Sequence, residues 1–266
     1  MKFLKLRSIK PIEHYYDTGE KPVLVVCSDT NAYICKYMRS SASAYKLACE
    51  LIGSVLADSW HLCSPSIALV NINPNHWTKY LGQNIIVSPS IGFKKIDNVV
   101  DITPSTSGMI TPSFKLIKQL MKIALFDFWV ANEDRNVNNA NLLFDLLNNS
   151  FIPIDFGCIF NTASFDFHMT QLTSTDSILS TNLFHHLVDD SGNKQVGEFI
   201  KSLSTLFFSY IENCHAVSEA ITTNMPREWN IPTEIVENKL QQLFDEAWIA
   251  NVWNNFEDCI YENIKQ

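Results

Sequence analysis

The feature that most constrains the fold of this chain is a single change of character near residue 100. Before that point, short runs of β-forming residues are separated by turn segments such as DTGEK and SDTN. One amphipathic helix, residues 43–58, interrupts these runs, with apolar residues at the i, i+3, i+4, i+7 spacing of a single buried face. The predicted strands are EHYY (13–16), PVLVVC (22–27), NAYICKYM (31–38), SPSIALVNI (64–72), QNIIVS (83–88) and IGFKKI (91–96).

A loop rich in Ser, Thr and Pro, residues 101–113, leads into a part of the chain that is mainly helical. The predicted helices cover 114–129, 194–214, 232–246 and 247–263, and two short apolar runs, NLLFDLL and FIPIDFG, lie between the first two. A strand-rich part with one helix, followed by a helix-rich part, predicts an α+β fold of two lobes, residues 1–100 and 101–266. We expect ligands to bind in the cleft between these lobes.

The composition argues against several classes of protein. Hydrophobic residues make up 46% of the 266 positions, which is typical of a globular protein. The formal charge of −8 argues against a protein that wraps nucleic acid directly or coats an anionic membrane. Seven scattered cysteines without a C-x-x-C pair indicate reduced thiols, and we recognise no signal peptide and no membrane-spanning run. We therefore expect a cytoplasmic protein.

The stretch VANEDRNVNNANLL, residues 130–143, places many polar residues directly after a predicted core helix. A calcium loop is one interpretation, because Asp134, Asn136 and Asn138 fit its first three ligand positions and Asp145 falls at its twelfth. Such a loop requires a glutamate at the twelfth position and a helix after it. Neither is predicted here, so this interpretation is disfavoured.

A catalytic loop is the second interpretation of the same stretch. Asp134 stands five residues before Asn139, and both precede the tripeptide Asp155-Phe156-Gly157. Phosphoryl transfer needs a carboxylate that orients or deprotonates the acceptor hydroxyl, together with an amide oxygen and a second carboxylate that hold Mg²⁺. The pattern D-x-x-x-x-N followed by D-F-G provides all three groups in that order.

The phosphates of a nucleotide also need a cation, and the first part of the chain offers one. Lys36 lies inside the apolar strand YICKYM, where an unpaired ammonium would be costly. Glu50 flanks the apolar stripe of the next helix, so its carboxylate can point toward the strand and pair with Lys36. A solvent-facing lysine and a surface glutamate remain an equally open interpretation at this stage. The kinase interpretation requires Lys36 and Asp155 to face one cleft, and a separation above about 15 Å would exclude it.

At this point the chain resembles a known family, the HipA-like kinases, and more distantly the phosphatidylinositol 3- and 4-kinases. The stretches that carry the resemblance are YICKYM, LACELIGSVLADSWHLCSPSIALV, DFWVANEDRNVNNANLLF and IPIDFG. The resemblance implies that Lys36 contacts the α/β-phosphates of ATP and that Glu50 orients it. It also implies that Asp134 is the catalytic aspartate, that Asn139 and Asp155 bind Mg²⁺, and that Arg135 braces the loop.

The chain departs from the better-known kinase pattern in its phosphate-covering turn and in its acceptor region. The candidate turn, residues 17–21, has Gly19 as its single glycine instead of G-x-G-x-x-G. Asn-Glu-Asp-Arg replaces H-R-D, and no A-P-E and no basic cluster follow Asp155. Because HipA-like enzymes are serine/threonine kinases, the resemblance implies a protein hydroxyl as acceptor. A lipid or a small molecule is the alternative acceptor, since related folds use both.

A catalytically weak module that binds a nucleotide or a partner protein is the competing hypothesis from another class. The incomplete glycine loop favours it, whereas the complete set of polar residues favours an active kinase. In this hypothesis the partner would be an antitoxin-like or regulatory protein.

Overall fold

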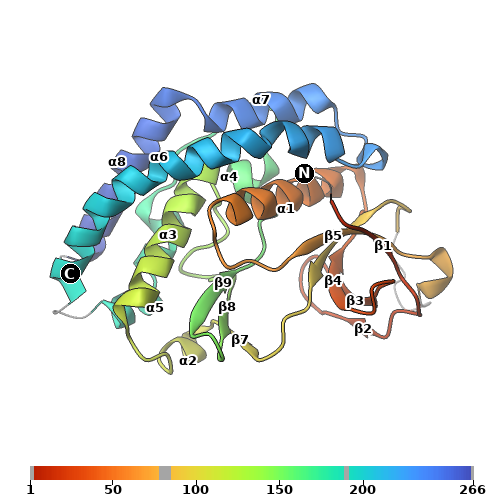
Figure 1. Ribbon diagram of the computed structural model, residues 1–266, viewed down its shortest axis with the longest axis horizontal. Helices are drawn as coiled ribbons and strands as arrows, with labels where there is room; N and C mark the ends of the chain where they lie inside the picture. Colours follow the sequence, from red (N-terminus) through yellow and green to blue (C-terminus); the bar gives the residue numbers. More distant parts are fainter. Residues whose placement is uncertain (1–2, 78–84, 189–191, 265–266) are drawn as a thin grey trace.

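The computed structural model describes residues 3–77, 85–188 and 192–264, and its fold is α+β. A six-stranded sheet occupies one end of the molecule and helices occupy the other (Figure 1). The strand order is β1-β5-β6-β4-β3-β2; β1 pairs with β5 in parallel and the other neighbours are antiparallel. Its strands are β1 (Lys5–Arg7), β2 (His14–Tyr15), β3 (Val23–Val26), β4 (Ala32–Lys36), β5 (Ile67–Asn71) and β6 (Ser90–Lys94).

Helix α1 (Ser41–Ser59) packs against one face of this sheet and reaches into the helical part. Ser40 caps its N-terminus, because the Ser40 side chain accepts from the backbone N of Ser43 while the Ser43 side chain accepts from the backbone N of Ser40. Apolar side chains of β3, β4 and β5 form a separate cluster on the opposite face of the sheet. Both faces of the sheet are therefore covered by apolar packing.

A three-stranded antiparallel sheet and a group of helices make up the rest of the fold. The strands are β7 (Val99–Asp101), β8 (Leu142–Asp145) and β9 (Ser150–Pro153). The helices are α2 (Pro104–Ser107), α3 (Phe114–Val130), α4 (Ile159–Ala163), α5 (Asn182–Leu187), α6 (Gly192–Asn224), α7 (Thr233–Leu243) and α8 (Glu246–Ile264). Short 3₁₀ turns lie at Pro74–His76, Ser174–Asp176, Ile178–Ser180 and Arg227–Trp229.

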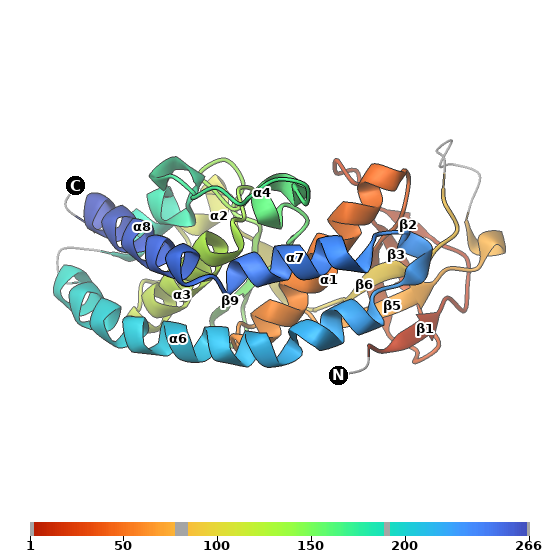
Figure 2. The same ribbon diagram turned by 90° about the horizontal axis from the view of Figure 1, so that it is seen from above.

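Helix α6, which is 33 residues long, packs against both α1 and α3. Figure 2 shows α6 running beside these two helices along the long axis of the molecule. On α6, the Cys214 thiol lies 3.7 Å from the carbonyl oxygen of Leu56 on α1. Because one rigid helix contacts both α1 and α3, it fixes the position of the sheet-bound helix relative to the helix that precedes the loop of residues 131–141.

The structure confirms the predicted helices and most of the predicted strands. The strand predicted over QNIIVS is wrong for residues 85–88, and residues 83 and 84 lie outside the described residues. Val87 is 71% exposed, so this apolar run is not buried as a core strand would be. All seven cysteines are free, as predicted from their spacing. Within the described ranges, no helix has the length and apolar character needed to cross a membrane.

Candidate active site

Lys36 is the last residue of β4, and the alternation of that strand decides where its side chain points. Tyr33 and Cys35 are buried in the apolar cluster on one face of the sheet. Because neighbouring side chains of a strand point to opposite faces, Lys36 points toward α1. Its side chain is only 11% exposed there, and a buried ammonium requires a negatively charged partner.

Glu50 on α1 provides that partner and is fully buried. Its Oε1 accepts a hydrogen bond from Lys36 Nζ, and its Oε2 accepts one from the backbone N of Phe156 at 2.9 Å. Burial raises the pKa of Glu50 to about 8, although the charge of Lys36 opposes this rise. The interpretation of a solvent-facing lysine and a surface glutamate is therefore wrong. Glu50 instead links β4 to the segment that follows β9.

Asp155, which follows β9, is a second negatively charged partner of Lys36. Its Oδ1 lies 2.8 Å from Lys36 Nζ, far inside the limit of about 15 Å that the kinase interpretation sets. Burial works against ionisation of Asp155, but the charge of Lys36 and hydrogen bonds from Glu50, Lys36 and the backbone of Gly157 together lower its pKa to about 2. The backbone of Asp155 is left-handed, with φ of 61°, a strained conformation that is frequent at functional sites. A Cβ at Gly157 would stand 3.1 Å from Glu50 Oε1, so the glycine keeps this corner open.

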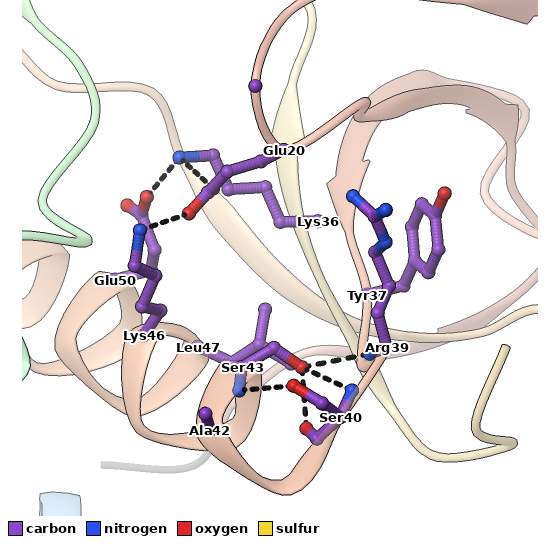
Figure 3. Close-up of a pocket in the computed structure, with 11 residues that line it drawn as sticks. Glu20, Lys36, Tyr37, Arg39, Ser40, Ala42, Ser43, Lys46, Leu47 and Glu50 are labelled. Atoms are coloured by element: carbon purple, nitrogen blue, oxygen red, sulfur yellow. Dashed lines mark hydrogen bonds and ion pairs between the residues drawn. The ribbon is translucent and has the colours of Figure 1, made fainter. Parts of the chain in front are cut away.

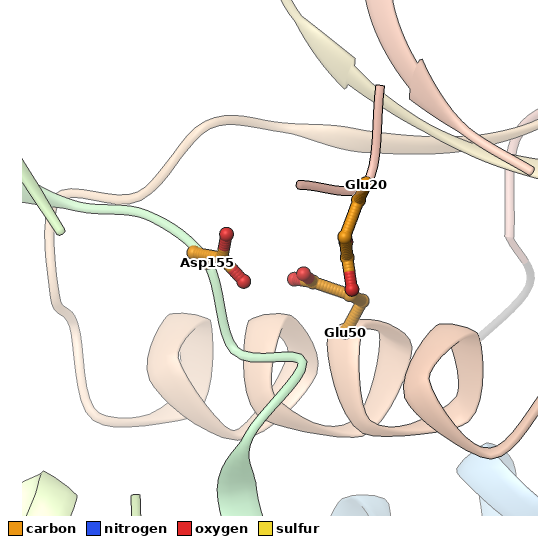
Figure 4. A group of neighbouring side chains, drawn as sticks. All are labelled: Glu20, Glu50 and Asp155. Carbon is orange, nitrogen blue, oxygen red and sulfur yellow. The ribbon is translucent and has the colours of Figure 1, made fainter. Parts of the chain in front are cut away.

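Glu20 is a further member of this cluster that the sequence analysis missed. It follows Gly19 in the turn of residues 17–21, and its Oε2 lies 2.9 Å from Lys36 Nζ. Figure 4 shows the carboxylates of Glu20, Glu50 and Asp155 pointing toward one another from three different segments. Burial opposes the charge of Lys36, but these three carboxylates together raise its pKa well above the usual range. Lys36 is therefore a fixed cation at the centre of an acidic group.

Lys36 and Glu50 border a cavity of about 610 Å³. Figure 3 shows it between the turn of residues 17–21, the end of β4 and the first turns of α1. Lys46 reaches into it from α1, and its Nζ lies 3.4 Å from Glu20 Oε1. The lining residues are Gly19, Glu20, Lys36, Tyr37, Arg39, Ser40, Ala42, Ser43, Lys46, Leu47 and Glu50. The cavity therefore contains two of the residues predicted to contact a nucleotide, Lys36 and Glu50, together with Gly19 of the phosphate-covering turn.

Asp134 and Asn139 are bonded to each other in the loop between α3 and β8. Asn139 Nδ2 donates to Asp134 Oδ2 at 3.2 Å, and Asn141 Nδ2 donates to the same oxygen at 2.9 Å. Asp145, which the calcium interpretation used, instead accepts from the backbone N atoms of residues 147 and 148 in the β8–β9 turn. A strand follows the loop, so the geometry does not support a calcium loop.

Arg135 braces the loop, as the resemblance implies. It is completely buried, and its Nε donates to Asp127 Oδ2 at 2.9 Å. Its Nη1 donates to the carbonyl oxygens of Ile154, at 3.0 Å, and Asn141. Burial raises the pKa of Asp127 to about 6, while Arg135 opposes the rise. The guanidinium thus ties α3, the loop and the end of β9 together.

Glu133 binds the chain that follows the D-F-G tripeptide. Its Oε1 accepts from Asn161 Nδ2 at 2.8 Å, and its Oε2 accepts from Thr162 Oγ1 at 2.9 Å. Residues 160–163 all have φ between 52° and 60° and form a left-handed turn, which non-glycine residues adopt only at a cost. Glu133, to which the sequence analysis gave no role, therefore fastens a strained turn to the residue next to Asp134.

The Cys158 thiol is influenced electrostatically by both groups of polar residues. Burial raises the pKa of the Cys158 thiol to about 11; the carboxylates of Asp134 and Asp155 add to this rise, and Lys46 opposes it. The thiol therefore lies in the field of charges from both the loop and the Lys36 cluster. In the part of the chain that the structure describes, no direct hydrogen bond joins Asp134 or Asn139 to Asp155.

Comparison with protein families gives a match over residues 9–258, to a family described as HipA-like kinase. The match spans nearly the whole chain. The chain belongs to the HipA-like kinase family. The resemblance seen in the sequence is thereby confirmed, and a kinase-type phosphotransferase is the activity of this family.

Among solved structures, this HipA-like kinase is similar to the crystal structure of a Helicobacter pylori proinflammatory kinase, CtkA. The TM-score is 0.50 at 12% identity, over 98% of this chain and 97% of that one, which shows the two-lobed kinase-like fold. The FAT and kinase domain of CtTel1 gives a TM-score of only 0.28 at 10% identity, over 95% of this chain and 23% of that one. No curated protein matches this sequence.

The donor atoms of this HipA-like kinase fit the divalent cation that kinases use. Asp155 offers a carboxylate that is ionised, because Lys36 lowers its pKa. Asn139 uses its amide nitrogen to bind Asp134, which leaves its amide oxygen as a ligand atom. Oxygen atoms of carboxylates and amides are the protein ligands that Mg²⁺ prefers.

Proposed function

We propose that this HipA-like kinase transfers the γ-phosphoryl group of ATP, together with Mg²⁺, to a hydroxyl group of a protein. The observation that carries the proposal is the contact of Lys36 with both Glu50 and Asp155. A kinase needs a cation for the nucleotide phosphates and a carboxylate for the metal within reach of each other. The cation, Lys36 Nζ, lies 2.8 Å from the carboxylate oxygen Asp155 Oδ1. We also propose residues 1–100 and 101–266 as the two lobes that enclose the nucleotide.

Lys36 is proposed to bind the α/β-phosphates, with Glu50 holding the ammonium in place. The buried carboxylate of Glu50 restricts Lys36 to one position, and Phe156 N restricts Glu50 in turn. A preorganised charge of this kind stabilises phosphates without the cost of ordering a flexible lysine. Gly19 lines the same cavity and is proposed to approach the phosphates through its backbone.

Asp155 and Asn139 are the residues that would hold Mg²⁺. When bound, the metal neutralises charge on the phosphates and orients the transferred group. Asp155 needs no proton loss near neutral pH, because Lys36 keeps it ionised. The bond from Asn139 to Asp134 keeps the amide next to the catalytic aspartate.

Asp134 is proposed to orient the acceptor hydroxyl and to accept its proton. Asn141 and Asn139 both donate to Asp134 Oδ2, so the hydrogen bonds that fix the side chain use that oxygen. Oδ1 then remains for the hydroxyl. A positioned general base of this type contributes about 10²- to 10⁴-fold to the rate.

A protein acceptor, serine/threonine specificity and a cytoplasmic location are parts of the same proposal. They are supported by the family and by the lack of a basic cluster after Asp155 in the sequence. A regulatory or antitoxin-like protein is proposed as a further binding partner, in addition to the protein substrate. No direct contact with nucleic acid is proposed, in line with the net charge of −8.

The test separates nucleotide binding from transfer. Wild type, Asp155→Asn and Asp134→Asn are melted with and without ATP and Mg²⁺, and incubated with γ-labelled ATP and a cell extract. We expect ATP with Mg²⁺ to stabilise wild type and Asp134→Asn but not Asp155→Asn. We expect label transfer by wild type, and a loss of about 10²-fold or more in Asp134→Asn. Asparagine tolerates the left-handed backbone at 155, so that variant should fold.

Three outcomes would contradict the proposal in whole or in part. A wild-type protein that ATP and Mg²⁺ neither stabilise nor label would exclude the nucleotide site. Label that enters only lipids or small metabolites would exclude the protein acceptor and retain the kinase. Stabilisation by nucleotide without any transfer would favour the catalytically weak binding module.

A further inference from the structure

Glu20 lies between two lysines at the mouth of the cavity. Its Oε2 is 2.9 Å from Lys36 Nζ, and its Oε1 is 3.4 Å from Lys46 Nζ, so each oxygen faces a different cation. Figure 3 shows Lys36 arriving from β4 and Lys46 from α1 on either side of this carboxylate. The two ammonium groups are spaced to bind the two oxygen atoms of one carboxylate. They are therefore also spaced to bind another anion that presents two oxygen atoms.

The position of Lys46 follows from the helix. Lys46 and Glu50 are four residues apart on α1, so their side chains lie on the same face. That face borders the cavity, and Glu50 already binds Lys36 there. Lys46 is 42% exposed at the mouth of the cavity, which leaves its ammonium accessible to a ligand. Burial lowers the pKa of Lys46, but Glu20 and other acidic groups nearby raise it by more, so the net pKa is above the usual value and the ammonium is charged at neutral pH.

The Glu20 side chain is held less tightly than that of Glu50. It is 33% exposed, whereas the Glu50 side chain is fully buried. A Cβ on Gly19, the preceding residue, would meet no atom within 4 Å, so this residue of the turn borders open space. The Glu20 carboxylate can therefore leave the lysines without disturbing the core.

A triphosphate cannot share this place with Glu20. The Glu20 carboxylate already contacts both lysines of the subsite, and its charge has the same sign as that of a phosphate group. Like charges in contact destabilise binding, so an incoming phosphate must displace this carboxylate to reach Lys36.

We propose that Lys46 is a second phosphate-binding residue, and that Glu20 occupies the subsite between Lys36 and Lys46 until the terminal phosphates of a nucleoside triphosphate displace it. The inference rests on the proposed function, because it assigns this subsite to the nucleotide of the transfer reaction. It extends that function in two ways. Lys46 provides phosphate contacts that a glycine-rich loop provides in other kinases. Glu20, in the turn of residues 17–21, competes with the phosphates of the nucleotide for the two lysines.

The test measures the equilibrium affinity of ATP with Mg²⁺ by calorimetry, in wild type, Glu20→Gln, Lys46→Met and the double variant. We expect Glu20→Gln to bind ATP about fivefold to tenfold more tightly, because glutamine keeps the shape and removes the competing charge. In the Glu20→Gln background, Lys46→Met should weaken ATP about fivefold to tenfold. Lys46→Arg should retain the affinity. Lys201→Met, which removes an exposed lysine on α6, is the matched control and should bind as wild type does.

The double variant is decisive, because a lysine that merely anchors Glu20 has nothing left to hold once Glu20 is glutamine. Equal affinities of Glu20→Gln and the double variant would overturn the role of Lys46. An unchanged or weakened affinity in Glu20→Gln would overturn the competing role of Glu20. If wild type binds no ATP, the proposed function fails together with this inference. If wild type binds ATP and Lys36→Met abolishes that binding while the double variant binds ATP as tightly as Glu20→Gln does, this inference alone fails.

Discussion

Replacement of Arg135 by leucine is the perturbation with the largest expected effect on stability. The guanidinium is fully buried and forms an ion pair with Asp127, whose side chain is 3% exposed. It also donates to the carbonyl oxygens of Ile154 and Asn141. Leucine fills part of the volume but leaves the carboxylate without its cation and two carbonyl groups without this donor.

The magnitude follows from the cost of an unpaired buried charge. Removal of one partner of a buried pair costs about 3–5 kcal/mol of unfolding free energy. The value is at the upper end here, because burial already raises the pKa of Asp127 to about 6 with Arg135 present. Without Arg135 that pKa rises further.

The pH dependence identifies the cause. The folded-state pKa of Asp127 lies above its unfolded value, so the folded protein binds a proton that the unfolded chain has released, and stability falls as pH rises between the two values. In wild type this fall ends at about pH 6. In Arg135→Leu it continues above pH 6, at up to about 1.4 kcal/mol per pH unit. The destabilisation should therefore be larger at pH 8 than at pH 6.

Urea unfolding of wild type and Arg135→Leu at pH 6 and pH 8 measures this difference. The double variant Asp127→Asn/Arg135→Leu is the control, because it removes the titrating carboxyl and should lose the extra pH dependence. A destabilisation below about 1 kcal/mol at pH 8 would refute the argument, since it would mean that the pair contributes no more than an exposed one. The same destabilisation at both pH values would refute the assignment to Asp127.

Two further predictions concern the contacts around the D-F-G tripeptide. Gly53→Ala should destabilise the protein by about 1–3 kcal/mol, because the new Cβ would lie 2.4 Å from Phe156 Cβ; an unchanged melting temperature would contradict this contact. Glu133→Ala should increase hydrogen exchange in residues 158–170, because it removes the bonds to Asn161 and Thr162 that hold the left-handed turn. Unchanged exchange there would show that the turn is held by other contacts.

The Lys36–Glu50 contact could be predicted because it depends on periodic patterns. The alternation of a strand turns Lys36 away from its buried neighbours, and the helical period places Glu50 beside the apolar face that packs on the sheet. The D-F-G tripeptide could be placed because it directly follows an apolar strand. Each of these inferences uses only the local geometry of one element.

The contact of Glu20 and the left-handed turn could not be predicted, because neither depends on a periodic pattern. Glu20 lies in a turn, where no period fixes the direction of a side chain, and its contact with Lys36 depends on how the turn folds over the sheet. The left-handed turn consists of non-glycine residues, so propensity argues against it. Strand β1 was missed because three residues carry almost no pattern, and its partner β5 lies more than sixty residues away.

Phe156 shows why the two halves of the site depend on each other. Its backbone N binds Glu50, which holds Lys36. Its ring lies against Gly53 on α1, contacts Phe126 on α3 at 5.7 Å between ring centroids, and stacks under the Arg135 guanidinium at 5.3 Å. Phe156 therefore contacts α1, which carries the Glu50 partner of Lys36, α3, which precedes the loop of Asp134, and the arginine that braces that loop. Because a buried ring cannot shift without opening a void or a clash, the packing of this side chain joins α1 at Gly53 to the arginine that braces the loop of Asp134.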